Sequence, residues 1–178
     1  MTDPLPRTAA SIVLRRLDAA DLRAFQTYRH DPELARYQGW APIADKDARD
    51  LLVHMSRTEL LQPGIWCQIG IAESSTQDLI GDIALILASD SANAEIGFTL
   101  RRESQGRGLA TAAVVEAIKL IFEHTKAETV IGTSDARNIS SIRLLERVGM
   151  RKVDTQGVIS RGKPCTQYVY AVGKRKLD

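Results

Sequence analysis

Apolar side chains recur along this chain with two different spacings, and segments of the two kinds follow one another. Apolar residues at alternate positions predict half-buried strands, and apolar residues spaced three and four apart predict helices that bury one face. The predicted strands are 11–17, 65–72, 79–87, 94–100, a short run around Val130, 151–155 and 167–172. The predicted helices are 18–28, one beginning at Asp31-Pro32, 45–59, 108–124 and one ending at Val148. This order, with a meander followed by β-α-β-α-β-β, predicts an α/β (α+β) protein with a mixed sheet.

Length and composition indicate a single domain. The chain has 178 residues, of which 44% are hydrophobic, enough for one ordinary core. We expect residues 1–10 to form a flexible N-terminal tail, 11–173 the domain, and 174–178 a basic C-terminal tail. The formal charge of +2 and the lack of other Lys/Arg-rich runs argue against a broad nucleic-acid-binding surface.

Two further observations bear on location and metal chemistry. Cys67 and Cys165 are far apart and lack the spacing of metal ligands, and no segment resembles a signal peptide. The longest strongly apolar run, 83–88, is far shorter than the roughly 20 residues of a transmembrane helix. We therefore expect a soluble cytoplasmic protein with reduced thiols, no metal and no membrane partner.

A glycine-containing loop, Gln105–Ala110 (the cradle loop), lies between the predicted strand 94–100 and the predicted helix 108–124. At a strand-to-helix junction several backbone N–H groups lack an intrahelical partner, and the helix dipole attracts anions. Gly106 and Gly108 let a ligand approach that backbone closely. Neither a Gly-Lys-Ser/Thr sequence nor a three-glycine dinucleotide fingerprint is present, so the loop predicts a different kind of phosphate site.

A second motif, Asn138–Met150, follows the short apolar run 129–132. Its apolar residues at helical spacing form one face, Asn138 or Ser140 is suited to cap the start, and Gly149 is suited to a left-handed stop. Alone, this pattern predicts only a short helix.

The two motifs together make the chain resemble the GCN5-related N-acetyltransferases (GNAT). Gln105, Gly108 and Ala110 match the family's Gln/Arg-x-x-Gly-x-Gly/Ala element, and Met150 stands where the second motif usually has Phe. Segments 12–17, 31–37 and 141–146 look most like the RimJ/RimL branch. The resemblance covers nearly the whole chain and implies a single domain with about seven strands, a V-shaped opening in the sheet, and four to five helices.

The resemblance also implies a co-substrate, acetyl-CoA, and residues that bind it. Its pyrophosphate is expected on the cradle loop and its pantetheine arm beside strand 94–100, where one backbone N–H would face the thioester carbonyl. Asn138 and Ser141 are expected near the pantetheine, although both equally suit helix capping. The complete set of expected co-substrate residues is Phe98, Leu100, Gln105, Gly106, Arg107, Gly108, Leu109, Ala110, Thr111, Asn138 and Ser141.

For catalysis the preferred base is Glu95, acting through water, and Asp82 is the weaker alternative base. Glu95 equally suits a solvent-facing or ion-paired position on its strand. Many family members protonate the leaving sulfur with a tyrosine, but Leu145 occupies that position here, so Ser141 is the nearest candidate acid. For the acceptor we expect Tyr37, Trp40 and, more weakly, Asp82, together with the segment 157–164. The two aromatic residues equally suit the closure of a core.

These features predict an N-acetyltransferase that moves an acetyl group from acetyl-CoA to a primary amine, either a protein N-terminal α-amine or a small molecule, by direct attack in a ternary complex. One alternative is a non-catalytic acyl-CoA sensor, which the missing tyrosine keeps open. Another is a nucleotide- or phosphate-binding protein with a chance match in the cradle loop. By resemblance, a homodimer is common for this architecture.

Overall fold

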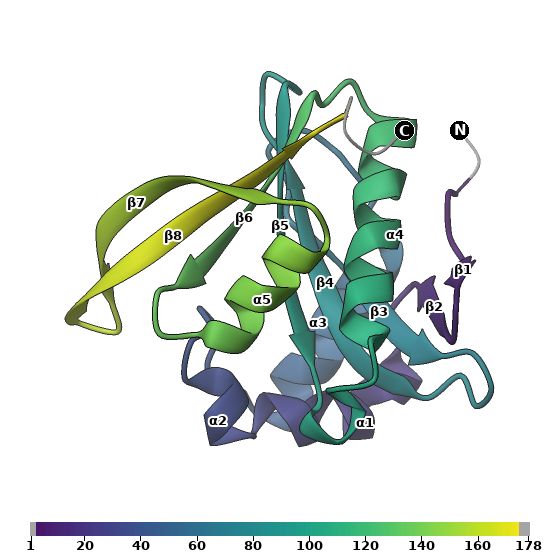
Figure 1. Cartoon of the computed structure of the whole chain (residues 1–178). Coiled ribbons are helices and arrows are strands. Elements are labelled where there is room, and N and C mark those ends of the chain that lie inside the picture. Colours follow the sequence, from purple (N-terminus) through teal and green to yellow (C-terminus); the bar gives the residue numbers. More distant parts are fainter. Residues whose placement is uncertain (1–2, 175–178) are drawn as a thin grey trace.

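One eight-stranded mixed sheet forms the centre of the protein in a computed structural model that describes residues 3–174 (Figure 1). The strands are β1 (Arg7–Ala9), β2 (Ile12–Arg15), β3 (Cys67–Glu73), β4 (Leu79–Leu87), β5 (Asn93–Leu100), β6 (Thr129–Asp135), β7 (Arg151–Ser160) and β8 (Lys163–Gly173). The helices are α1 (Leu22–Arg29), α2 (Pro32–Ala35), α3 (Asp45–Arg57), α4 (Leu109–His124) and α5 (Ile139–Arg147), with short 3-10 turns at Ala19–Asp21 and Arg102–Ser104. The predicted mixed α/β fold is confirmed.

The sheet opens in its middle. Its strand order is β1-β2-β3-β4-β5-β6-β8-β7, and β5 with β6 is the parallel pair. That pairing covers only Asn93–Ile96 against Thr129–Gly132, after which β5 runs on to Leu100 beside β4 and β6 runs on to Asp135 beside β8. The two halves therefore diverge beyond Ile96 and Gly132, which is the V-shaped opening that the resemblance implied.

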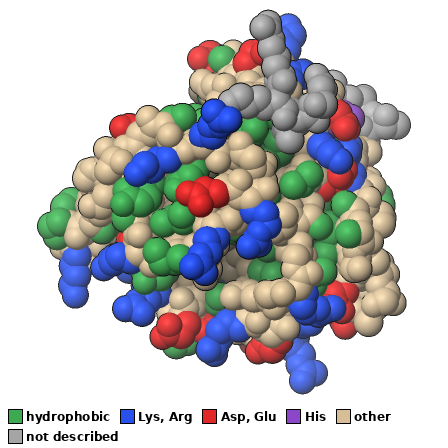
Figure 2. Space-filling model, viewed as in Figure 1, with side chains coloured by type: hydrophobic (Ala, Val, Ile, Leu, Met, Phe, Trp, Pro, Cys, Tyr) green, Lys and Arg blue, Asp and Glu red, His purple; other side chains and the backbone are tan. Residues whose placement is uncertain are grey.

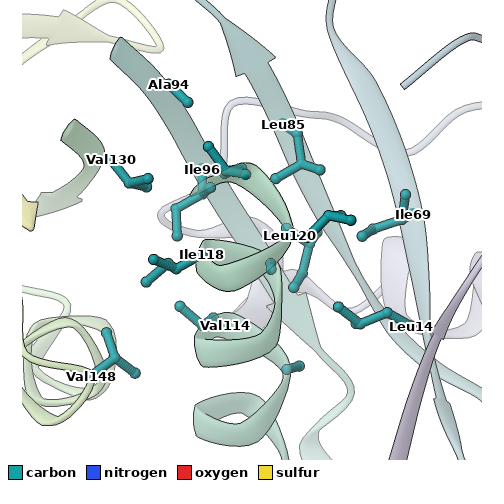
Figure 3. Packing of buried hydrophobic residues seen from close by; sticks show 14 of the residues in the cluster. Leu14, Ile69, Leu85, Ala94, Ile96, Val114, Ile118, Leu120, Val130 and Val148 are labelled. Carbon is teal, nitrogen blue, oxygen red and sulfur yellow. The ribbon is translucent and has the colours of Figure 1, made fainter. Parts of the chain in front are cut away.

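Helix α4 covers one face of the sheet and fills the larger core. Figure 3 shows Val114, Ile118 and Leu120 of this helix pointing toward side chains from both halves of the sheet. The facing residues labelled there are Leu14, Ile69, Leu85, Ile96 and Val130, with Val148 from the end of α5. Each fully buried side chain of this size contributes roughly 1.5–3 kcal/mol, so α4 holds the two diverging halves together.

The N-terminal helices build a second core on the opposite face. Phe25 and Tyr28 of α1 pack with Leu52 of α3 against Leu17 and Leu79. Asp31 caps α2 by accepting the N–H of Glu33, with Pro32 at the first helical position as predicted. These helices place the loop that follows α2 beside the open part of the sheet.

Part of the segment 1–10, which we expected to be a flexible tail, forms strand β1. Arg7–Ala9 pairs antiparallel with Ile12–Leu14, which also brings the strand count to eight among residues 3–174. Leu5 is buried in the larger core, and the Arg7 guanidinium lies 2.6 Å from Glu116 and 2.7 Å from Glu123 of α4. A three-residue strand is too short to show a period, and the ion-pair partners of Arg7 lie more than 100 residues away. The predicted basic tail, 174–178, falls outside the described residues except for Lys174.

Strands β7 and β8 are longer than predicted. They form a hairpin, the arm hairpin, that makes up one edge of the sheet and extends to the left of Figure 1, with its tip at the lower left. Most of β7 is exposed, so alternating burial gives no signal there. No helix among residues 3–174 has the length and apolar character needed to span a bilayer.

Candidate active site

The open edge of β5 presents backbone groups with no strand beside them. The N–H of Arg101 donates to Ile80 O on the β4 side. Because successive residues of a strand direct their backbone groups to opposite sides, Phe98 and Leu100 direct theirs toward the gap left by β6. Side chains already meet two of these groups: Gln105 Nε2 donates to Leu100 O at 2.9 Å, and Gln38 Nε2 donates to Phe98 O at 3.2 Å.

The cradle loop leads from this edge directly into α4. Gly106 and Gly108 have φ values of 74° and 76°, a left-handed conformation that favours glycine. The first intrahelical bond runs from Ala112 N–H to Gly108 O, so the N–H groups of the first turn have no acceptor within the helix. Gly108 has no side chain with which to cap them.

One cavity of about 580 Å³ joins the open edge of β5 to the cradle loop. Its lining residues that the sequence analysis had named for the co-substrate are Phe98, Leu100, Gln105, Gly106, Gly108, Leu109, Ala110, Thr111, Asn138 and Ser141. Arg107 is not among them, because its guanidinium turns away and pairs with Glu73 of β3 at 2.8 Å. The structure thus brings together all but one of the residues expected to hold acetyl-CoA.

Three arginines that the sequence analysis did not name line the same cavity: Arg102, Arg143 and Arg147. Arg102 pairs with Asp31 at 2.6 Å, whereas Arg143 and Arg147 have no ion-pair partner within residues 3–174. Figure 2 shows Lys and Arg side chains gathered over the lower half of this face, near the start of α4 and along α5. The spacing of Arg143 and Arg147, four residues apart on a predicted helix, was the signal that they share a face.

Asn138 and Ser141 hold the start of α5 at the mouth of the opening. The Asn138 Oδ1 accepts the N–H of Ser141 at 3.3 Å, so the capping role is present, and both residues also line the cavity. Leu145, at the position of the family's tyrosine, is fully buried, with its Cδ2 2.8 Å from where a Cβ on Gly132 would lie. The hydroxyl-bearing residues of α5 that line the cavity are Ser140 and Ser141, of which the sequence analysis had named Ser141.

Glu95 lies on the other face of the sheet, next to the point where β5 and β6 diverge. Its neighbours Ala94 and Ile96 pack into the α4 core, so the Glu95 side chain points to the opposite face. It is half-buried, has no hydrogen-bond or ion-pair partner within residues 3–174, and does not line the cavity. Burial raises the pKa of this carboxyl above its ordinary value, because nothing nearby compensates the desolvated charge.

Asp82 is buried beneath α1 and is only 2% exposed. Its Oδ2 accepts from the Tyr28 hydroxyl at 2.6 Å and from Arg29 Nη2 at 2.9 Å. Burial and the neighbouring Asp82 carboxylate raise the pKa of Tyr28 well above its ordinary value. This arrangement favours a role for Asp82 in holding α1 against the sheet over the acceptor contact suggested by the sequence.

The two aromatic residues expected at the acceptor lie on the loop after α2 (the acceptor loop, Arg36–Trp40). Tyr37 lines the cavity, with the Arg36 and Arg137 guanidiniums 5.5 Å and 5.7 Å from its ring centroid. Trp40 does not line it and instead lies 4.6 Å from the Arg29 guanidinium. Of the two expected acceptor residues, Tyr37 therefore lies at the cavity, whereas Trp40 packs against Arg29 of α1.

An open sheet edge that runs into an uncapped helix N-terminus suits an extended ligand that carries a phosphate group. The sequence pattern of the acetyltransferase (GNAT) domain matches residues 11–151, and the chain belongs to this family. It is an acyl-CoA-dependent N-acetyltransferase with acetyl-CoA as its co-substrate. No group of three metal-binding side chains occurs in the described part of the chain.

Curated and solved relatives agree with this assignment. An uncharacterized N-acetyltransferase p20 from Bacillus licheniformis is 25% identical over 172 residues, covering 93% of this chain and 94% of that protein. A GNAT-family acetyltransferase from Bacillus anthracis superposes with a TM-score of 0.86 at 19% identity, covering 97% of this chain and 100% of the other. The ribosomal L7/L12 alpha-N-protein acetyltransferase RimL, solved with coenzyme A, gives a TM-score of 0.78 at 14% identity over 94% of this chain and 96% of its own. The structural likenesses show a shared fold.

Proposed function

We propose that the enzyme transfers the acetyl group of acetyl-CoA to a primary amine by direct attack in a ternary complex, the amine being a protein N-terminal α-amine or a small molecule. The observation that carries this proposal is the single cavity that joins the open β5 edge to the uncapped start of α4. The RimL neighbour is described as an alpha-N-protein acetyltransferase in complex with coenzyme A, which supports the peptide end of this range.

The residues present suit the co-substrate part by part. The free N–H groups at the start of α4 suit a pyrophosphate, since they donate where the helix dipole is positive. The guanidiniums of Arg143 and Arg147 supply positive charge at the same cavity. The Leu100 N–H faces the gap beside β5, and a donor aimed at a thioester oxygen stabilises its developing negative charge by roughly 3 kcal/mol.

In the proposed reaction the amine nitrogen attacks the thioester carbonyl carbon, the C–S bond breaks, and the amine loses one proton. Glu95 takes that proton through water, and its raised pKa makes the carboxylate a better base than an ordinary glutamate. The sulfur leaves as a thiolate, which needs little assistance because a thiol pKa lies near 8.5. Ser141 is the proposed proton donor to the thiolate, and its hydroxyl takes up a proton from solvent water in return, so that the serine ends the reaction unchanged.

A non-catalytic acyl-CoA sensor is the second candidate, and the burial of Leu145 in place of a tyrosine favours it. The deciding experiment measures thiol release from acetyl-CoA with a panel of peptides of varied N-terminal residue, polyamines, amino acids and aminoglycosides. Calorimetry measures CoA binding in parallel. Thiol release that depends on one class of amine supports the transferase; binding without release supports the sensor; absence of binding refutes the site itself.

A further inference from the structure

The tip of the arm hairpin is a two-residue turn with an unusual first residue. Arg161 and Gly162 connect β7 to β8 with φ values of 50° and 74°, the combination that a two-residue hairpin turn of the primed type requires. Asn or Gly ordinarily occupies the first position, because a side chain in the left-handed region costs about 1 kcal/mol or more. Such a backbone conformation persists where contacts of the residue compensate its cost, and the side chain of Arg161 makes such contacts.

The Arg161 side chain crosses to the opposite wall of the site. Its Nη2 donates to Ala35 O at 2.7 Å, to Trp40 O at 2.9 Å and to Gln38 O at 3.3 Å. Ala35 is the last residue of α2, and its carbonyl, which also accepts the N–H of Gln38 at 3.2 Å, has no partner within the helix itself. One guanidinium thus joins the arm hairpin to the end of α2 and to both halves of the acceptor loop.

Two of the three carbonyls that Arg161 binds, those of Gln38 and Trp40, belong to the acceptor loop, which reaches the proposed point of acetyl transfer. Tyr37 and Gln38 line the cavity, and the Gln38 side chain donates to Phe98 O on the open β5 edge. From the side of α1, the loop is held by stacking of Trp40 on Arg29. From the opposite side the loop is held by Arg161, which lies 121 residues after Trp40 and 126 residues after Ala35 in the sequence.

We propose that Arg161 is a positioning residue for the acceptor amine: by binding three carbonyls it fixes Tyr37 and Gln38 at the acceptor side of the cleft. This inference rests on the proposed function. Because Arg161 does not line the cavity around the cradle loop, its loss changes the handling of the acceptor and leaves the affinity for acetyl-CoA unchanged.

The informative variant is Arg161→Gly. Glycine suits φ of 50°, so the hairpin turn keeps or gains stability while the guanidinium is removed. Losing hydrogen bonds to a charged donor, or displacing the acceptor amine by about an ångström, each lowers kcat/KM by about tenfold or more. We therefore expect kcat/KM for the acceptor to fall about tenfold or more, KM for acetyl-CoA to stay within about twofold, and millimolar guanidinium ion to restore part of the loss.

Lys163→Gln is the matched control, since it removes a cation from the same hairpin tip at a residue that binds none of these carbonyls. Arg161→Lys keeps the charge without the guanidinium and should show an intermediate loss. Equal acceptor kinetics in the Arg161→Gly and wild-type enzymes would overturn the proposal. So would a parallel rise in both KM values together with a lower melting temperature, which indicates general loosening of the fold.

Hydrogen exchange of residues 35–41 tests the same inference without turnover. Exchange in this segment should quicken in Arg161→Gly and not in Lys163→Gln; unchanged exchange refutes the anchoring role. A wild-type protein that releases no thiol with any amine would instead refute the proposed function, while the exchange result would still decide whether Arg161 holds the loop.

Discussion

Replacing Asp82 by Asn is expected to destabilise the fold by about 3 kcal/mol and to leave KM for the acceptor unchanged. Arg29 is 5% exposed, so without the carboxylate its buried charge has no anionic partner among the described residues. Removing one partner of a buried ion pair costs roughly 3–5 kcal/mol, and Asn keeps an oxygen that accepts a hydrogen bond, which places the cost at the lower end. For a domain of this length about 3 kcal/mol corresponds to a fall in melting temperature of roughly 6–12 °C.

Urea denaturation of the wild-type and Asp82→Asn proteins measures this cost, and steady-state kinetics measure KM. The double variant Arg29→Met/Asp82→Asn removes both charges and is expected to be less destabilised than the sum of the two single variants. An Asp82→Asn protein that unfolds within about 1 kcal/mol of wild type, with acceptor KM raised about tenfold, would refute this reasoning and make Asp82 an acceptor ligand.

Three further predictions concern the cleft. Glu95→Gln should lower kcat by about 10²–10⁴-fold with CoA binding intact in calorimetry. A base must be ionised to act, and burial raises the Glu95 pKa. The kcat/KM of the wild-type enzyme should therefore begin to fall, as the pH is lowered, at a higher pH than an ordinary glutamate would give. If the same fall persists in Glu95→Gln, it belongs to another group. Gly108→Ala adds a Cβ that meets no atom within 4 Å but forces alanine to φ of 76°, at a cost of about 1–2 kcal/mol. The affinity for CoA should therefore fall about fivefold to thirtyfold. Unchanged affinity and stability would show that the left-handed backbone is dispensable. Replacing Arg143 and Arg147 together by Gln should raise KM for acetyl-CoA and flatten its dependence on salt, whereas an unchanged salt dependence would place the phosphates elsewhere.

The sequence predicted the parts of the fold that depend on local pattern. Leu79–Leu87 was predicted to the residue, because nearly every side chain of β4 is buried and flanking turns bound it. The cradle loop was predictable for the same reason: glycine spacing and the following helix are local features. The opening of the sheet, by contrast, was inferred from resemblance, because no local sequence pattern indicates that the pairing of β5 with β6 ends at Ile96 and Gly132.

What the sequence could not supply are contacts between distant segments. Asp82 was expected near the acceptor, but its partners Tyr28 and Arg29 lie more than 50 residues earlier, and only folding brings them together. Arg161 was included merely as part of the segment 157–164, because nothing in a turn sequence tells which carbonyls an arginine will meet. The charge of a residue can be read from sequence, whereas its partner cannot.

At the open edge of β5, the side chains and the backbone groups of the same residues have different functions. The side chains of Phe98 and Leu100 belong to the α4 core, while their backbone groups face the gap in the sheet. Under the proposed function, packing thus constrains the choice of side chain, and the ligand depends on atoms that every amino acid except proline possesses. Such a site tolerates wide divergence of sequence: at Leu100 an isoleucine or methionine would disturb only packing, whereas a proline would abolish the donor while leaving an apolar side chain in place.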